Sequence, residues 1–117
     1  MTTPPSDKST DPSDRISVRY VFETRIQIRL QRDSRKLGLQ GWTRDLSESG
    51  LAAFVAEALL PGESVTLEIP MGNSGKQTIP ARVVRALGTE YGFQFTALSA
   101  EQRGQIKATL QDRPAIS

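Results

Sequence analysis

The chain of 117 residues contains neither cysteine nor histidine. Without cysteine there are no disulfides and no thiolate chemistry, which is compatible with a cytoplasmic protein. Without either residue a zinc site would depend on carboxylates alone, so we expect no metal. A nucleophile–base pair built on Cys or His is excluded as well, so we expect a protein that is not an enzyme.

Long apolar runs are also missing from the sequence. No stretch approaches the roughly 18 apolar residues that are needed to span a bilayer. The first five residues, Met-Thr-Thr-Pro-Pro, do not combine a basic region with a following apolar stretch. We therefore expect no signal peptide, no membrane insertion and a cytoplasmic location.

The charge is nearly balanced, with 15 Lys and Arg against 13 Asp and Glu and a net charge of +2. This small excess favours an anionic partner but does not call for DNA or RNA. Eleven of the fifteen cations are Arg. Because Arg binds planar anions through two parallel hydrogen bonds and stacks on bases, its dominance suits a compact anionic ligand.

The chain divides into a tail, one domain and a short second tail. Residues 1–13 have no large apolar side chain after Met1 and predict a disordered tail. Residues 14–111 have the apolar alternation of a folded domain, and 112–117 are expected to form a C-terminal tail. Polar turns separate six predicted strands, which begin at Tyr20 and then cover about 37–46, 51–55, 65–69, 78–87 and 91–96.

The end of the domain predicts a helix. Ser99 is a good N-cap and Gln102 is its capping-box partner. Ile106 and Leu110 lie four residues apart on one face of a helix that extends to about Gln111. Six short strands followed by a helix predict the all-β class: a closed antiparallel barrel with one terminal helix.

Two short motifs carry recognisable binding chemistry. The first is RxxxR at Arg15 and Arg19, and the second is DxSxxG at Asp45, Ser47 and Gly50. Two guanidiniums offer forked donors to phosphates or to a guanine edge. A carboxylate and a hydroxyl can accept from and donate to another guanine edge. In their order, spacing and strand context, the two motifs resemble the PilZ domain, the bacterial receptor module for cyclic di-GMP.

The resemblance covers about residues 14–111 and includes the Pro-Gly turn at 60–67 and the strands at 81–85 and 91–95. It implies a six-stranded antiparallel β-barrel with a C-terminal α-helix and a flexible N-terminal arm. It also implies cyclic di-GMP as the ligand and no cofactor. The residues with implied binding roles are two arginines that grip phosphates and guanines, an Asp and a Ser that hold a guanine, and a Gly that lets the backbone turn closely beneath it: Arg15, Arg19, Asp45, Ser47 and Gly50.

Two departures from the family pattern bear on binding. Asp14 stands where many members carry a further Arg, which predicts one ligand per chain in place of a stacked pair, unless Arg44 or Arg85 supplies the missing charge. Val83 stands where some members place an aromatic that stacks on guanine. The absence of a π-face there predicts a modest affinity.

The sequence is compatible with three functional hypotheses. The first is a stand-alone cyclic di-GMP receptor that signals to an unidentified effector protein by ordering its N-terminal arm. The alternative is a PilZ-like β-barrel interaction module that does not bind nucleotide. The third, a single-strand binder like the OB-fold proteins, needs exposed aromatic platforms. It is disfavoured because the aromatics total seven and four of them, Phe22, Phe54, Phe93 and Phe95, are expected in the core.

Overall fold

The strands of the barrel follow from an alternation of apolar and polar residues. The computed structural model describes residues 18–72 and 75–116. In the second strand the side chains of Ile26, Ile28 and Leu30 are buried, and the residues between them are exposed or half-buried. The elements in chain order are β1 (Tyr20–Val21), β2 (Arg25–Arg32), β3 (Arg35–Leu46), β4 (Gly50–Val55), β5 (Ser64–Pro70), β6 (Lys76–Leu87), β7 (Glu90–Phe95) and α3 (Ala100–Leu110).

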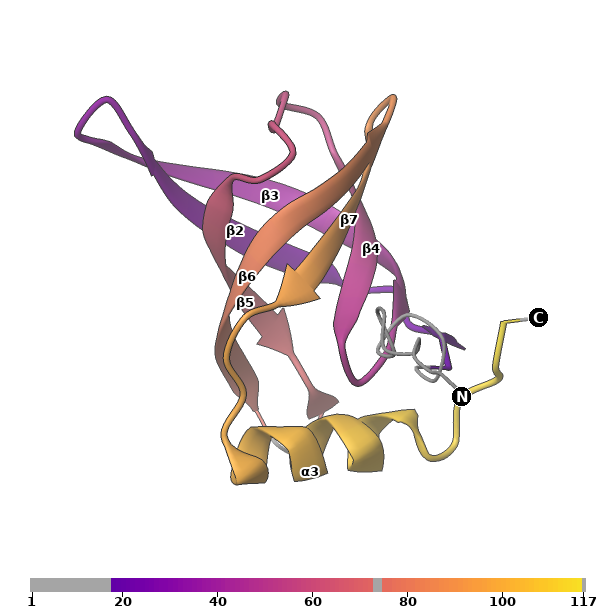
Figure 1. Cartoon of the computed structure of the whole chain (residues 1–117). Coiled ribbons are helices and arrows are strands. Elements are labelled where there is room, and N and C mark those ends of the chain that lie inside the picture. The colour runs from indigo at the N-terminus through magenta and orange to yellow at the C-terminus, as the bar shows by residue number, and fades with distance from the viewer. Residues whose placement is uncertain (1–17, 73–74, 117) are drawn as a thin grey trace, which may run out of the picture.

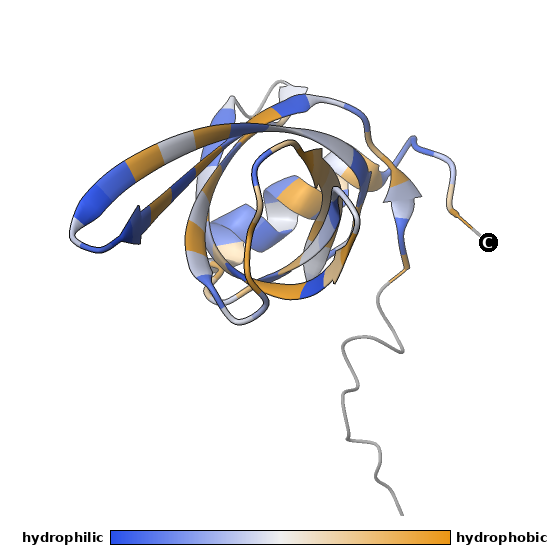
Figure 2. Cartoon of the chain, turned by 90° about the horizontal axis from the view of Figure 1, so that it is seen from above, coloured by the Kyte–Doolittle hydropathy of each residue, from blue (hydrophilic) through white to orange (hydrophobic). Residues whose placement is uncertain are grey.

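The six long strands close into an antiparallel barrel (Figures 1 and 2). Their order is β3-β2-β5-β6-β7-β4, and β4 pairs back with β3. Closure removes most of the free strand edges, which would otherwise attract other chains. The predicted barrel of six strands with one helix is therefore confirmed, and β1 is a short addition that pairs with the end of β3.

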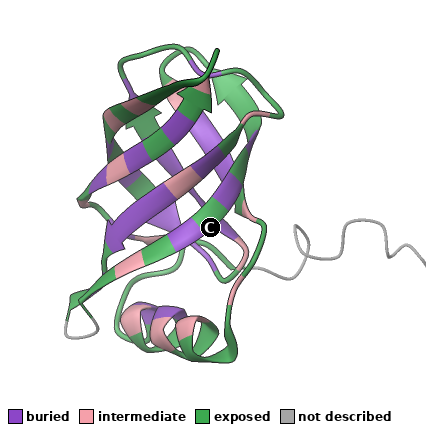
Figure 3. Cartoon of the chain, turned by 90° about the vertical axis from the view of Figure 1, so that its left-hand side faces the viewer, coloured by how far each residue is buried: buried purple, intermediate pink, exposed green. Residues whose placement is uncertain are grey.

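The helix α3 lies across one end of the barrel (Figures 1 and 3). The predicted capping box at Ser99 and Gln102 is present, and the predicted apolar face buries Ile106 and Leu110. The Gln102 side chain also donates to the carbonyl of Thr78 on β6 over 3.0 Å, which ties the helix to the barrel. In the described part of the chain, no helix is sufficiently long and apolar to cross a membrane.

The first predicted strand is interrupted at residues 22–24, between β1 and β2. The Thr43 hydroxyl of β3 forms hydrogen bonds with the backbone of this interruption. It donates to the carbonyl of Phe22 over 2.6 Å and accepts from the amide of Thr24 over 2.8 Å. Since Thr43 is fully buried, these bonds fix the base of the N-terminal arm against the barrel.

One core prediction is wrong. Phe22 and Phe93 are buried and Phe95 is half-buried, but the side chain of Phe54 is 42% exposed. Side chains alternate between the two faces of a strand, so Phe54 points to the same outer face as Ala52, two residues earlier on β4.

Candidate functional site

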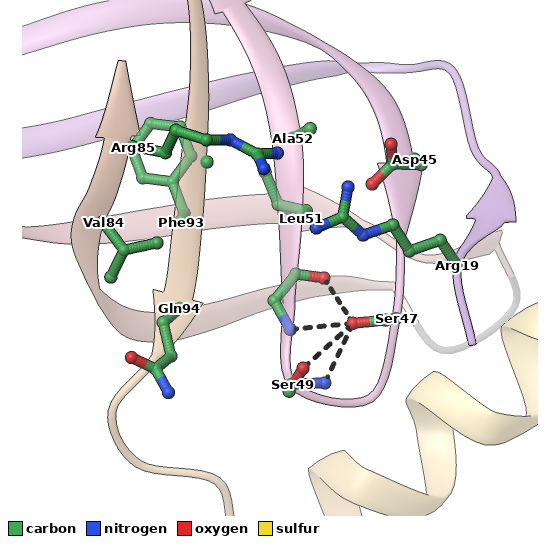
Figure 4. Close-up of a pocket in the computed structure, with 12 residues that line it drawn as sticks. Arg19, Asp45, Ser47, Ser49, Leu51, Ala52, Val84, Arg85, Phe93 and Gln94 are labelled. Carbon is green, nitrogen blue, oxygen red and sulfur yellow. Dashed lines mark hydrogen bonds between the residues drawn. The ribbon is translucent and has the colours of Figure 1, made fainter. Parts of the chain in front are cut away.

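A pocket of about 300 Å³ lies on the outer face of the barrel (Figure 4). It is lined by the segment before β1 and by residues of β3, β4, β6 and β7. Arg19, Asp45, Ser47 and Gly50 all line it, so four of the five predicted site residues meet in one place. The fifth, Arg15, lies outside the described residues.

The floor of the pocket is a row of residues on four neighbouring strands. Asp45 is opposite Ala52, Ala52 is opposite Gly92, and Gly92 is opposite Arg85. Directly opposed residues of an antiparallel sheet point to the same face. The two small residues leave a shallow floor, with a carboxylate at one end and a guanidinium at the other.

Two β-bulges bring the charged ends of this row onto the outer face. Arg44 is an extra residue between Thr43 and Asp45 on β3, and Val84 is an extra residue between Val83 and Arg85 on β6. A bulge shifts the alternation of the strand by one residue and so re-aims the side chains that follow it. Without the second bulge, the alternation that buries Val83 would also turn Arg85 toward the core.

Arg85 lies along the surface of Gly92. A β-carbon placed on Gly92 would meet the Cβ of Arg85 at 3.4 Å and its Nε at 3.6 Å. In Figure 4 the guanidiniums of Arg85 and Arg19 extend toward the pocket from opposite sides. The pocket lining therefore presents two guanidiniums and one carboxylate.

The Asp45 carboxylate is 2% exposed and is held by Arg44 through Oδ2. Arg44 contacts its Oδ2 at 3.1 Å and also pairs with Glu90 at 3.0 Å. Both contacts of Arg44 with this carboxylate are made to Oδ2, the second being a hydrogen bond from Nε over 3.2 Å. An ionised carboxylate accepts several hydrogen bonds, so Asp45 can also accept from a ligand donor in the pocket.

Ser47 builds the loop that borders the pocket. Its hydroxyl accepts from the amides of Ser49 at 3.1 Å and Gly50 at 3.2 Å. Its own amide donates to the carbonyl of Gly50 over 2.8 Å. These are the bonds of a tight polar turn, so Ser47 shapes the site whatever it binds.

Gly50 is required by close packing at the start of β4. A β-carbon at this position would overlap the carbonyl oxygen of Phe93 on β7. The motif glycine thus lets two strands approach closely beneath the loop.

Two positions on β6 differ from the sequence-based expectation. Arg85 lines the pocket, although the sequence marked it only as an alternative source of charge. Val83 is fully buried in the barrel core, so its identity does not decide stacking on a ligand, and Val84 lines the pocket in its place. The bulge explains both outcomes. An Arg that breaks the apolar alternation directly after two adjacent valines was the only sequence signal of this shift.

Comparison with known proteins identifies the family. The PilZ domain model matches residues 13–112, and the chain belongs to the PilZ domain family. No curated protein matches this chain at a significant level.

Solved structures share the fold at low sequence identity. The PilZ domain of CeSA from a cellulose-synthesizing bacterium is 20% identical with a TM-score of 0.61, over 80% of this chain and 94% of that chain. The PilZ domain with c-di-GMP of YcgR from Escherichia coli is 18% identical with a TM-score of 0.66, over 83% and 88%. The Bacillus subtilis inhibitor of motility MotI/DgrA is 21% identical with a TM-score of 0.61, over 83% and 47%.

Proposed function

We propose that this protein is a bacterial, cytoplasmic receptor for cyclic di-GMP, without enzymatic activity. The observation that supports this most strongly is that residues from both motifs, far apart in the sequence, line one pocket: Arg19, Asp45, Ser47 and Gly50. The structure of the PilZ domain of YcgR with c-di-GMP supports the choice of ligand. Arg15 completes the proposed site from outside the described residues.

The carboxylate of Asp45 suits a guanine edge. Guanine carries neighbouring N–H donors, and an ionised carboxylate accepts hydrogen bonds without donating any. Asp45 lines the pocket, and Arg44 keeps its carboxylate in place through Oδ2. Ala52 and Gly92 leave room for a flat base to lie against the strands.

The guanidiniums suit the phosphates. Arg19 and Arg85 reach into the pocket from opposite sides, and each can form two parallel bonds to a phosphate. Cyclic di-GMP carries two negative charges, so two guanidiniums beside one carboxylate give a complementary field. The addition of Arg15 would strengthen that field.

The proposed output is a change in the N-terminal arm. Arg19 lies at the end of the arm, and contact between its side chain and the ligand would favour an ordered arm over other arrangements. An effector protein that recognises the ordered arm would then read the signal.

Calorimetric titration of the wild type and three single variants with cyclic di-GMP tests this function. Arg19→Ala and Arg85→Ala should each weaken binding about 10- to 100-fold, the range for losing hydrogen bonds to a charged group. Arg35→Ala is the matched control, because Arg35 is exposed at the tip of the β2–β3 hairpin and is not part of the pocket lining.

Two results would contradict the proposal. If the wild type does not bind, the alternative of a PilZ-like interaction module without nucleotide is correct. If the wild type binds but both pocket variants match the control, the ligand occupies another site.

A further inference from the structure

Residues 114–116 lie along residues 19–21 as a short antiparallel strand. The amide of Ile116 donates to the carbonyl of Arg19 over 2.8 Å, and the amide of Val21 donates to the carbonyl of Pro114 over 2.9 Å. Tyr20 and Ala115 face each other between these bonds. We call residues 113–116 the clip, because they join the end of the domain to the base of its arm.

Arg113 anchors the clip at the helix. Its guanidinium lies over the ring of Phe22, 4.9 Å from the ring centre, and its Nε donates to the carbonyl of Thr109 on α3 over 3.2 Å. Phe22 is buried, and the last helical residue, Leu110, is also part of the core. The clip is therefore connected to the packed interior through one cation–π contact and the helix end.

The clip ends beside the ligand pocket. Arg19 lines the pocket, and the next residue, Tyr20, begins β1, which pairs with β3. In the described part of the chain, the bond from Ile116 to Arg19 is the last backbone hydrogen bond on the arm before residue 18. Together with the pairing of Tyr20 with Leu46 on β3, this bond fixes the backbone from which the Arg19 side chain enters the pocket.

We propose that the clip is a positioning element of the ligand site, and this inference rests on the proposed binding of cyclic di-GMP. It holds the backbone of Arg19 so that the guanidinium is already over the pocket when the ligand arrives. A pre-organised group loses less conformational freedom on binding, which raises affinity. By linkage the ligand must stabilise the clip to the same degree, so the signal extends from the arm to residues 113–116.

A pair of proline variants isolates the hydrogen bond. Ile116→Pro removes the N–H that donates to Arg19. Ala115→Pro is the matched control, because Ala115 faces Tyr20 without exchanging a bond and its own N–H points away from the arm. Calorimetry with cyclic di-GMP should show affinity about three- to tenfold weaker for Ile116→Pro and nearly unchanged for Ala115→Pro.

Two further measurements separate positioning from a general structural role. If the clip acts through Arg19, Ile116→Pro should have almost no additional effect on affinity in an Arg19→Ala background. In the wild type, saturating cyclic di-GMP should slow hydrogen exchange of the Ile116 amide, and Arg19→Ala should abolish that slowing.

The outcomes distinguish the inference from the proposed function. If the wild type binds and Ile116→Pro matches Ala115→Pro, the positioning role is wrong and the receptor function stands. The same conclusion follows if Ile116→Pro weakens binding equally with and without Arg19. If the wild type does not bind, the receptor function is overturned, and the positioning role is overturned with it.

Discussion

Gly50 has a structural role that can be measured apart from binding. Its missing β-carbon is what allows β4 to start against the carbonyl of Phe93. Gly50→Ala should lower the free energy of unfolding by about 1–3 kcal/mol, the range for overpacking a tight site. Urea unfolding followed by tryptophan fluorescence would measure this, because the chain has a single Trp.

Gly38 provides the control for this substitution. It lies on β3 and a β-carbon there would have no neighbour within 4 Å, so Gly38→Ala should leave stability equal or slightly higher. Equal stabilities for Gly50→Ala and Gly38→Ala would show that the motif glycine is not needed for packing.

The pocket residues also show which features a sequence pattern can predict. Asp45, Ser47 and Gly50 could be predicted because a short motif places them around the turn that joins β3 to β4. Arg85 could not be placed because its direction depends on the bulge at Val84. A period of two describes a regular strand, and a bulge is the point at which that period fails.

The β2–β3 hairpin is the element that projects furthest from the barrel (Figure 1). Arg32 lies at the turn end of the hairpin, opposite Arg35, and contacts the Glu63 carboxylate through Nε at 2.6 Å and Nη2 at 2.9 Å. The same guanidinium donates to the carbonyl of Ala58 over 2.9 Å, so the hairpin is tied to the loop between β4 and β5.

This pair predicts a pH dependence of stability. The hydrogen bonds from Arg32 lower the pKa of the Glu63 carboxyl below its ordinary value of 4.5. A carboxyl whose pKa is lower in the folded state stabilises the fold above its ordinary pKa, and this contribution disappears as pH falls through the folded value. Glu63→Gln should therefore be less stable than the wild type at pH 7, with a difference that shrinks below about pH 4.5.

Denaturant unfolding of both proteins at neutral and acid pH would test this. Glu57→Gln is the control, since Glu57 is an exposed carboxylate in the same loop and has no ion pair in the described part of the chain. A stability difference between wild type and Glu63→Gln that stays constant from pH 7 into acid would contradict the account.

At the scale of the whole molecule, the barrel and helix could be predicted because each strand has its own local alternation. The pairing of residues 19–21 with 114–116 could not, because it joins segments more than ninety residues apart and has no local pattern. The interruption between β1 and β2 was missed for a similar reason, since it depends on the hydroxyl of Thr43 on another strand.

The balance of charge around the site predicts the number of ligands. A stacked pair of cyclic di-GMP molecules brings four negative charges, and Asp14 adds a fifth beside the motif. We expect calorimetry to saturate at one ligand per chain at micromolar concentrations, with a preference of about tenfold, or about 1.4 kcal/mol. Asp14→Arg should tighten binding and move the ratio toward two.

Asp7→Arg is the control for this charge change, because it has the same effect on net charge but lies seven residues further from the motif. Saturation of the wild type at two ligands would contradict the prediction and would indicate that Arg85 already supplies the missing charge.

The described part of the chain has a second groove that could receive a ligand. One measurement distinguishes binding in that groove from binding in the motif pocket. An open groove of about 960 Å³ lies between the β2–β3 hairpin and strands β5 and β6, and it contains none of the motif residues. Amide NMR spectra recorded during titration with cyclic di-GMP would report on both sites at once. Binding in the motif pocket should produce saturable shifts at Gly50, Ala52 and Gly92 and leave Gly38 and Thr66 of the groove unchanged. Shifts confined to the groove, or none at millimolar nucleotide, would contradict it.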